Sequence, residues 1–392
     1  MGFKYVVIGA GRQGVAAAYD LGVFGRADEI VLLDIDGSAA EAAAGRLNQL
    51  LGRRVARGAA ADAGDIRALR PYLQDATGCI SSVHFTFNLA ITRLAIEQRV
   101  NLTDFGGNTE VVRQQLELDP EARAAGIAIV PDCGMGPGLN VSLATYVMSL
   151  IEEPREVLIW DGGLPQDPRP PWNYACAFAL GGLTNEYAGD AYFLRDGGVT
   201  PAPCFSGYET LEFPPPIGTL EAFVTSGGLS TAPWTFEGKL QRLENKTLRY
   251  PGHAAQFKAF SDLGLLDLDP INAGGQRVVP RDVFHALLAP RIQRGEDFRD
   301  VCVMRVHGRG ETRGRDVEAV VELVDWYDEQ RGFTAMQRLT GWHGSIMLIA
   351  AIERRVRPGV VSVETAVPGK TVVDECLRRG LSVKTSAASA RE

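Results

Sequence analysis

The stretch FKYVVIGAGRQGVAAAYDLG, residues 3–22, decides the fold of this chain. It starts with a short β-rich apolar run, continues through Gly9, Gly11 and Gly14 in a GxGxxG pattern, and then becomes helical. In such a unit the first glycine permits a tight turn, the second lets the backbone approach a pyrophosphate, and the third allows close packing of helix on strand. The first N–H groups of the helix face the phosphate. The stretch therefore predicts a dinucleotide-binding βαβ unit.

The end of the next strand indicates which cofactor binds there. The apolar run at residues 30–33 ends at Asp34, 20 residues beyond Gly14. A carboxylate at this place accepts hydrogen bonds from both ribose hydroxyls of NAD and repels the 2′-phosphate of NADP. Residues 35–37 contain no Arg or Lys to bind that phosphate. We therefore expect NAD as the cofactor; the alternative is that Asp34 caps the following helix.

Other residues are expected beside the cofactor because of their places in the strand and helix pattern. Asp62 follows the third strand, near the adenine, and Ser81 and Ser82 end the fourth strand, near the nicotinamide ribose; each is equally compatible with a turn or a helix cap. Gly134 and Pro137 belong to a turn that lets backbone approach the cofactor or substrate, or that simply joins a strand to a helix. The full expected set is Gly9, Gly11, Arg12, Gln13, Gly14, Asp34, Asp62, Ser81, Ser82, Gly134 and Pro137.

Strands and helices alternate through the first third of the chain, which is typical of a doubly wound parallel sheet. From about residue 155 Pro and Gly become dense, and short β runs with hairpin-like spacing predict mainly antiparallel strands. We therefore expect an α/β protein with a Rossmann domain at 1–138, an inserted α+β substrate-binding and dimerisation domain at 139–340, and C-terminal helices at 341–392 that return to the Rossmann domain and end in a disordered tail from Thr385. The expected strands include 30–33, 78–83, 101–104, 127–130, 157–160, 221–224 and 317–324, and the expected helices include 38–51, 88–98, 110–125, 345–355 and 371–379.

Composition and charge argue against several classes of function. The 392 residues are 45% hydrophobic and 22% charged, as in ordinary soluble proteins, and the net charge of −8 argues against nucleic acid or an anionic membrane as the main partner. The six cysteines lie far apart without a CxxC pair, so neither a disulfide framework nor a metal site is expected. We find no signal-peptide pattern and no apolar run near the ~20 residues that span a bilayer. A cytoplasmic location is therefore expected.

Several segments resemble one family of oxidoreductases over most of the chain. They are VVIGAGRQG at 6–14, DCGMGPGL at 132–139, GGLP at 162–165, NEY at 185–187 and TLRYPGH at 247–253. On these motifs the chain resembles the saccharopine dehydrogenase-like oxidoreductases, and among them the lysine 6-dehydrogenases. GGLP and TLRYPGH are the most specific, because neither belongs to generic dinucleotide-binding proteins. The chain departs from the family at Phe178 and Gly181, where a Trp and more polar residues are often seen, and in the Pro-rich segment 201–216, all expected near the substrate pocket.

The resemblance implies an NAD-dependent dehydrogenase, commonly a homodimer, that acts on a small amine or amino acid. For a lysine 6-dehydrogenase it implies oxidation of L-lysine at the ε-carbon, hydrolysis of the imine, and release of 2-aminoadipate 6-semialdehyde, which cyclises to piperideine-6-carboxylate. Family members also act on saccharopine or on carboxylated polyamine precursors, so a dehydrogenase or reductase of a secondary amine, such as a carboxynorspermidine-type enzyme, is the alternative. A second alternative is an NAD-binding sensor that lacks the chemistry.

Four residues in the family motifs suit the binding of an amino acid. Arg249 is the expected clamp for the carboxylate, because a guanidinium binds a carboxylate through two hydrogen bonds and stays charged; the alternative is an ion pair at the surface or between domains. His253 is expected as a base or as a donor to the carboxylate, with helix capping as the alternative. Glu186 and Tyr187 are expected to meet a distal amine, unless they form a solvated helix start.

Two strand ends supply the remaining candidates for the chemistry. Asp104 is expected to bind the substrate ammonium or relay a proton; the alternative is that it stabilises the turn at residues 104–107. Cys133 is expected to build the wall near the nicotinamide instead of acting as a nucleophile, because hydride transfer needs no covalent intermediate. The predicted catalytic group is therefore Asp104, Cys133 and His253.

Overall fold

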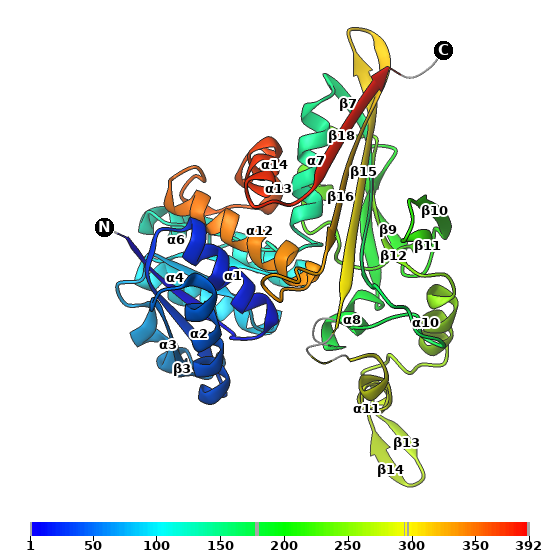
Figure 1. Ribbon diagram of the computed structural model, residues 1–392. Coiled ribbons are helices and arrows are strands. Elements are labelled where there is room, and N and C mark those ends of the chain that lie inside the picture. The colour runs from blue at the N-terminus through cyan, green and yellow to red at the C-terminus, as the bar shows by residue number, and fades with distance from the viewer. Residues whose placement is uncertain (1, 177–179, 294, 296–297, 390–392) are drawn as a thin grey trace.

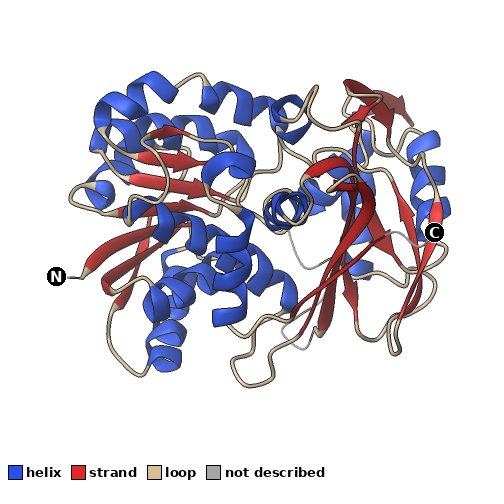
Figure 2. Ribbon diagram, turned by 90° about the horizontal axis from the view of Figure 1, so that it is seen from above, coloured by secondary structure: helices blue, strands red, loops and turns tan. Residues whose placement is uncertain are grey.

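The computed structural model describes residues 2–176, 180–293, 295 and 298–389. These residues form two main sheets, one in each half of the molecule (Figures 1 and 2). Figure 2 shows the sheet of the N-terminal half covered by helices, and the second sheet standing beside it across the molecule. The α/β class expected from the sequence is confirmed, with one parallel sheet and one mostly antiparallel sheet.

The first sheet is a seven-stranded parallel sheet in the order β17-β6-β5-β4-β1-β2-β3. Strand β1 pairs with β2 on one side and with β4 on the other, so the strand order reverses there. Ligands of such sheets bind at this reversal, beyond the carboxyl ends of the strands. The strands are β1 (Phe3–Ile8), β2 (Ala27–Asp34), β3 (Ala56–Ala60), β4 (Gly78–Ser81), β5 (Asn101–Asp104), β6 (Ala128–Val130) and β17 (Gly359–Val360).

Helices on both faces of this sheet follow the predicted alternation, with one difference. The single helix expected over 110–125 is two helices, because Pro120 near the start of the second lacks an N–H group and its ring cannot continue the first. The helices of this part are α1 (Arg12–Phe24), α2 (Gly37–Leu51), α3 (Ile66–Leu73), α4 (Asn88–Gln98), α5 (Thr109–Leu116) and α6 (Asp119–Ala125), with a 3₁₀ turn at Phe85–Phe87.

The second sheet has nine strands and is antiparallel except where β12 runs parallel to β7. Helix α7 (Leu139–Ser149) packs on one face, where Gly308 and Gly310 leave room for the side chains of Val147 and Ile151. The strands are β7 (Glu153–Pro165), β8 (Asp190–Arg195), β9 (Gly198–Pro203), β10 (Glu209–Phe213), β11 (Gly218–Phe223), β12 (Arg242–Arg249), β15 (Asp300–Thr312), β16 (Arg315–Trp326) and β18 (Val383–Ser389). The peripheral elements are α8 (Leu180–Glu186), α9 (Ala232–Thr235), α10 (His253–Asp262), α11 (Pro280–Ile292) and the hairpin β13 (Ile271–Ala273) with β14 (Gln276–Val278).

Helix α12 (Ala335–Ile352) carries the chain back to the first sheet and packs along α1 (Figure 1). It starts ten residues before the helix expected at 345–355, because Thr334 and Gln337 form a capping box there. The boundary expected between residues 340 and 341 therefore falls inside this helix. Two further helices follow, α13 (Val363–Ala366) and α14 (Gly369–Arg378), and α14 packs against α7.

The C-terminal segment expected to be disordered is ordered in part. Strand β18 (Val383–Ser389) includes residues 385–389 of this segment. It pairs with β16 in antiparallel register from Val317↔Ser389 to Leu323↔Val383. The expectation was wrong for residues 385–389 because the edge of β16 offers a row of backbone donors and acceptors that a segment of small residues can pair with, whatever its composition. Residues 390–392 lie outside the described part of the chain.

Candidate functional site

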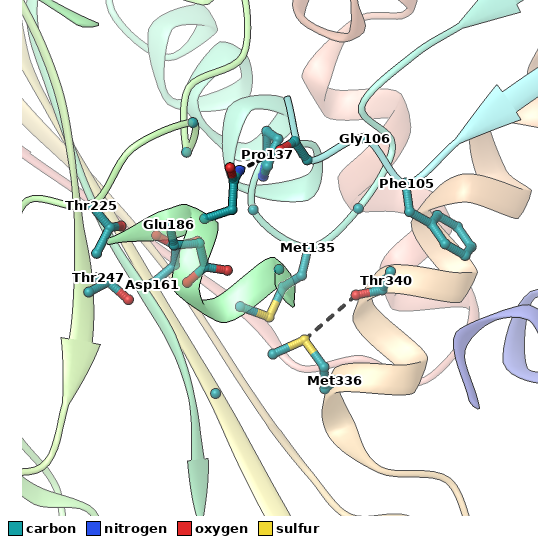
Figure 3. A pocket seen from close by; sticks show the side chains of 18 of the residues that line it. Phe105, Gly106, Met135, Pro137, Asp161, Glu186, Thr225, Thr247, Met336 and Thr340 are labelled. Atoms are coloured by element: carbon teal, nitrogen blue, oxygen red, sulfur yellow. Dashed lines mark hydrogen bonds between the residues drawn. The ribbon is translucent and has the colours of Figure 1, made fainter. Parts of the chain in front are cut away.

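A cavity of about 340 Å³ lies between the two sheets (Figure 3). Loops after β4, β5 and β6 form one side, and the facing ends of β7 and β12 with helix α8 form the other. In Figure 3, Asp161, Glu186, Thr225 and Thr247 lie on the side of the second sheet, opposite Met336 and Thr340 of helix α12. The cavity therefore stands at the strand-order reversal of the first sheet, where a bound dinucleotide would place its reactive end.

The glycine turn has the geometry that a dinucleotide requires. Gly9 has a φ of +99°, and a Cβ on Gly14 would stand 2.0 Å from the Gly9 carbonyl oxygen, so both positions exclude a side chain. A Cβ on Gly11 would meet no atom within 4 Å, which leaves open space beside the turn. Helix α1 begins there without a side-chain cap, so its first N–H groups face that space. These residues fit a bound pyrophosphate.

Asp34 lies at the end of β2 beside this turn. Its Oδ2 accepts a hydrogen bond from the backbone N–H of Ala10 at 3.0 Å, and its Oδ1 accepts one from Asp36 at 3.2 Å. The cap of helix α2 is Asp36, whose Oδ1 accepts from the N–H groups of Ser38 and Ala39. The capping alternative for Asp34 therefore does not hold, and its carboxylate stands at the glycine turn.

The structure brings some of the other expected cofactor residues to the cavity. Gln13, Ser82, Gly134 and Pro137 line it. Ser81 is buried and donates to Asn88 Oδ1 at 2.7 Å, which is a structural contact. The positions of the remaining two are as follows: Arg12 donates to the Gly295 carbonyl at 3.2 Å, and Asp62 is exposed and accepts from the Gly64 N–H at 2.8 Å.

Arg249, at the end of β12, faces the cavity from the second sheet. The residue is 4% exposed, and its Nη1 donates to Thr247 Oγ1 at 2.7 Å and to the Leu248 carbonyl at 2.9 Å. The guanidinium carbon lies 5.1 Å from the centre of the Tyr174 ring, and Nη2 lies 3.5 Å from Glu186 Oε2. These contacts fix the orientation of a buried cation, which is what a carboxylate clamp needs.

Two carboxylates share the cavity with Arg249. Burial raises the pKa of Glu186 to about 7, although Arg249 opposes the shift. Burial also raises the pKa of Asp161 to about 6, opposed by a hydrogen bond from Asn245 and by Arg249. Asp161 and Asn245 were not among the residues expected from the sequence. Asp161 directly precedes the GGLP motif, and Asn245 stands just before the TLRYPGH motif, so their closeness to both was the available signal.

His253 and Tyr187 lie behind the cavity wall. Both are buried, the Tyr187 hydroxyl lies 2.8 Å from His253 Nε2, and the imidazole stacks on Phe257 with ring centres 4.1 Å apart. Burial, together with the charge of Arg249, holds the pKa of His253 well below its usual range. The N-cap residue of helix α10 is Gly252, and the Glu221 carboxylate accepts from the N–H groups of Gly252 and Ala254. The structure therefore places this pair in a packed wall beside Arg249.

Asp104 and Cys133 are fully buried behind the cavity-lining turns. The Asp104 carboxylate accepts from Gly106 N–H at 2.8 Å, Asp132 N–H at 3.1 Å and Gln115 Nε2 at 2.8 Å, so it ties together the ends of β5 and β6. The Cys133 thiol donates to the Val130 carbonyl at 3.2 Å, and burial raises its pKa well above the usual range. The geometry gives both residues roles in shaping the cavity from behind.

The three places where the sequence departs from the family were all expected near the substrate pocket, but the structure does not place all of them there. Phe178 lies outside the described residues. Gly181 stands in α8 next to Gly182, which lines the cavity. The Pro-rich segment 201–216 was expected near the substrate pocket, but it contributes no lining residue, because it runs through β9 and β10 on the far side of the wall.

The described residues contain neither a cluster of metal-binding side chains nor a helix that could cross a membrane. Among these residues, no three His, Cys, Asp or Glu side chains are grouped so that they could hold a metal ion. No helix within the described ranges has both the length and the apolar character needed to cross a membrane.

Comparison with family models decides the relationship. The model of the saccharopine dehydrogenase C-terminal domain matches residues 134–380, and that of the saccharopine dehydrogenase NADP binding domain matches residues 5–130. The chain belongs to the saccharopine dehydrogenase family. The family resemblance expected from the sequence motifs is therefore confirmed, and members of this family are NAD(P)-dependent oxidoreductases that act on amines.

Individual relatives of this saccharopine dehydrogenase family member are distant. The NADP(+)-dependent, L-glutamate-forming saccharopine dehydrogenases of Pyricularia oryzae and Saccharomyces cerevisiae are both 26% identical, over 48% and 53% of this chain and 43% and 48% of theirs. The chain thus spans about half the length of these relatives. The solved structure of the yeast enzyme matches 99% of this chain and 100% of that chain, with a TM-score of 0.78 and 18% identity. Homospermidine synthase from Legionella pneumophila in complex with NAD matches 99% and 92%, with a TM-score of 0.66 and 13% identity. These structural matches show the fold.

The glycine turn generates a prediction about cofactor binding. Gly11→Ala should leave the thermal midpoint of the cofactor-free protein unchanged, because φ at Gly11 is −69° and the added Cβ meets nothing within 4 Å. It should weaken NAD binding about fivefold to a hundredfold by crowding the pyrophosphate. Titration calorimetry and the NAD-induced rise in thermal midpoint measure both effects.

Gly45→Ala, in the open middle of helix α2, is the matched control and should bind NAD like the unaltered protein. Equal NAD affinity for Gly11→Ala would show that the phosphates do not lie against this turn.

Proposed function

We propose that this protein catalyses NAD-dependent oxidative deamination of an amino acid at its side-chain amine, with L-lysine as substrate and 2-aminoadipate 6-semialdehyde, which cyclises to piperideine-6-carboxylate, as product. The observation that carries the proposal is the set of charges in the cavity. One guanidinium, Arg249, and two carboxylates, Asp161 and Glu186, face the same space. This set complements a molecule with one carboxylate and two amines.

The charge count also favours lysine over a secondary-amine substrate. Among the described residues that line the cavity, Arg249 is the one Arg or Lys side chain. Saccharopine carries further carboxylates at the end of the molecule away from the lysine head group, and each would need its own cation or donor cluster. The names of two relatives, a saccharopine dehydrogenase and a homospermidine synthase, favour a saccharopine or polyamine-type reaction as the second candidate.

Substrate binding and substrate deprotonation each have a residue in the cavity. Arg249 holds the carboxylate, and Glu186 takes a proton from the side-chain ammonium so that the amine is neutral. NAD, when bound, accepts the hydride from the ε-carbon. The resulting imine is hydrolysed by water to the aldehyde and ammonia. The chain itself thus supplies orientation and one proton acceptor.

The choice of NAD is supported by Asp34, whose carboxylate lies against the glycine turn at the expected ribose position. A 2′-phosphate there would be repelled by this carboxylate. The relatives from Pyricularia and yeast are named for NADP(+), so the proposal assigns this chain a different preference from theirs.

The amine substrate is tested directly by following reduced nicotinamide absorbance with NAD and a panel of L-lysine, L-ornithine, polyamines and saccharopine. We expect the largest signal with L-lysine, because the polyamines lack its carboxylate and saccharopine carries further carboxylates that the cavity does not pair. Turnover of saccharopine and not lysine would move the assignment to the second candidate. Silence with every amine, with NAD binding shown by calorimetry, would indicate a cofactor-binding protein without this chemistry.

Cofactor preference is tested by Asp34→Ser. The ratio of kcat/KM for NAD to that for NADP should fall about tenfold to a hundredfold, because the variant loses charge-assisted hydrogen bonds to the ribose and no longer repels the phosphate. Asp36→Asn removes the adjacent charge while keeping the cap of helix α2, and should shift the ratio much less. An unchanged ratio in Asp34→Ser would mean that the ribose lies elsewhere.

The pH dependence tests Glu186. A base is active when ionised, and its pKa is raised to about 7, so kcat/KM for lysine should rise as pH increases through about 7. Glu186→Gln should lower kcat about a hundredfold or more and abolish that rise. Glu209→Gln, which alters a carboxylate paired with Lys246 outside the cavity, should keep the profile. A profile that is the same in Glu186→Gln would assign the rise to another group.

A further inference from the structure

Asp161 is a buried carboxylate with one satisfied oxygen and one open oxygen. It stands near the C-terminal end of strand β7, its residue is 7% exposed, and Asn245 Nδ2 donates to its Oδ1 at 2.6 Å. Its Oδ2 lies against the Cα of Gly136, where an added Cβ would be only 2.2 Å away. Within the part of the chain that the structure describes, no donor hydrogen-bonds this second oxygen.

The same carboxylate has no cation of its own. Among residues 2–176, 180–293, 295 and 298–389, no Arg, Lys or His nitrogen lies within 4.0 Å of it, whereas Glu186 has Arg249 at 3.5 Å. An ionised carboxylate in a buried place is costly unless a cation is paired with it. Both Asp161 and Gly136 line the cavity, so a ligand can reach the open oxygen.

Asp161 is held at a fixed place beside the carboxylate clamp. Strands β7 and β12 are parallel neighbours, with Asp161 in register with Thr247. Thr247 in turn accepts the hydrogen bond from Arg249 Nη1. Adjacent strands thus present a carboxylate and a guanidinium side by side, as the ammonium and carboxylate of an amino-acid head group require.

We propose that Asp161, oriented by Asn245, binds the α-ammonium group of the substrate while Arg249 binds its α-carboxylate. This inference rests on the proposed function and deepens it, because it makes the α-amino group, which takes no part in the reaction, a requirement for recognition. The enzyme is then specific for α-amino acids with a side-chain amine and selects against simple ω-amino acids and diamines.

The two carboxylates divide their roles by chemistry. The α-ammonium keeps its charge throughout the reaction, so it is a lasting counter-ion for Asp161. The reacting amine must become neutral, and it meets Glu186, whose charge Arg249 already balances. The asymmetry in ion pairing therefore assigns the static amine to Asp161 and the reacting amine to Glu186.

Substrate analogues that each lack one charge of the head group test this assignment. 6-Aminohexanoate lacks the α-ammonium, and pentane-1,5-diamine lacks the carboxylate. The unaltered enzyme should prefer L-lysine to 6-aminohexanoate about tenfold to a hundredfold in kcat/KM. In Asp161→Asn the ratio of kcat/KM for L-lysine to kcat/KM for 6-aminohexanoate should fall to about one. The value for lysine should decrease, and the value for 6-aminohexanoate should change little.

Arg249→Ala is the matched control, because it should impair lysine and 6-aminohexanoate together and spare pentane-1,5-diamine. An equal loss with all three substrates in Asp161→Asn, or a preference that survives the substitution, would overturn the subsite. Should Asp161→Asn not fold, the unaltered enzyme decides. Turnover of α-N-acetyl-L-lysine, which keeps the α-carboxylate but has a neutral amide in place of the α-ammonium, as fast as that of lysine would overturn the proposal, and rejection would support it.

Failure of the proposed function has a different signature. If no amine is oxidised, lysine and 6-aminohexanoate can still be compared by the rise each causes in the thermal midpoint of the NAD-saturated protein. A rise with lysine that disappears in Asp161→Asn supports the subsite without the reaction. Equal rises with both compounds, or none with either, would overturn it.

Discussion

The packing of helix α12 on helix α1 is the contact on which the rest of the structure depends. At Gly341 the two helices approach so closely that a Cβ would stand 2.7 Å from the Ala17 nitrogen and 2.8 Å from the Gln13 carbonyl oxygen. One part of α12, with Leu339 and Ile346, enters the core of the second sheet, and Leu348 enters the core of the first. A single helix therefore joins both cores and sets the distance across the cavity between them.

The same helix links the cofactor side to the substrate side. The Asp300 carboxylate, at the start of β15, accepts from the N–H groups of Ala335 and Met336 at 2.7 and 2.9 Å, which anchors the first turn of α12 to the second sheet. Met336 and Thr340 from that end of the helix line the cavity, and Gln13 of the glycine turn faces it from α1. The helices that bring these residues to the cavity are thus held to both sheets by packing and by hydrogen bonds.

The polar residues around the cavity differ in how their ionisable groups are compensated for burial. The Asp104 carboxyl accepts three hydrogen bonds at the strand ends, which oppose the rise that burial causes in its pKa. His253 stacks on an aromatic ring, and burial holds its pKa well below the usual range. Asp161 and Glu186 lie at the cavity, where burial raises the pKa of each toward neutrality and leaves an oxygen accessible. Of these two carboxylates at the cavity, Glu186 has Arg249 as a counter-ion and Asp161 has no cation within 4.0 Å among the described residues.

The sequence by itself determined the glycine turn, the acid at the end of β2, the parallel sheet and the family, because each depends on residues close together in the chain. It also indicated Arg249 and Glu186 through their motifs. Only the tertiary structure decided that Asp161 and Asn245 join them, and that Asp104, Cys133 and His253 lie behind the wall. Whether a polar side chain faces a cavity or a neighbouring backbone group depends on how strands distant in sequence pair and on what packs across them, which local residue patterns do not determine.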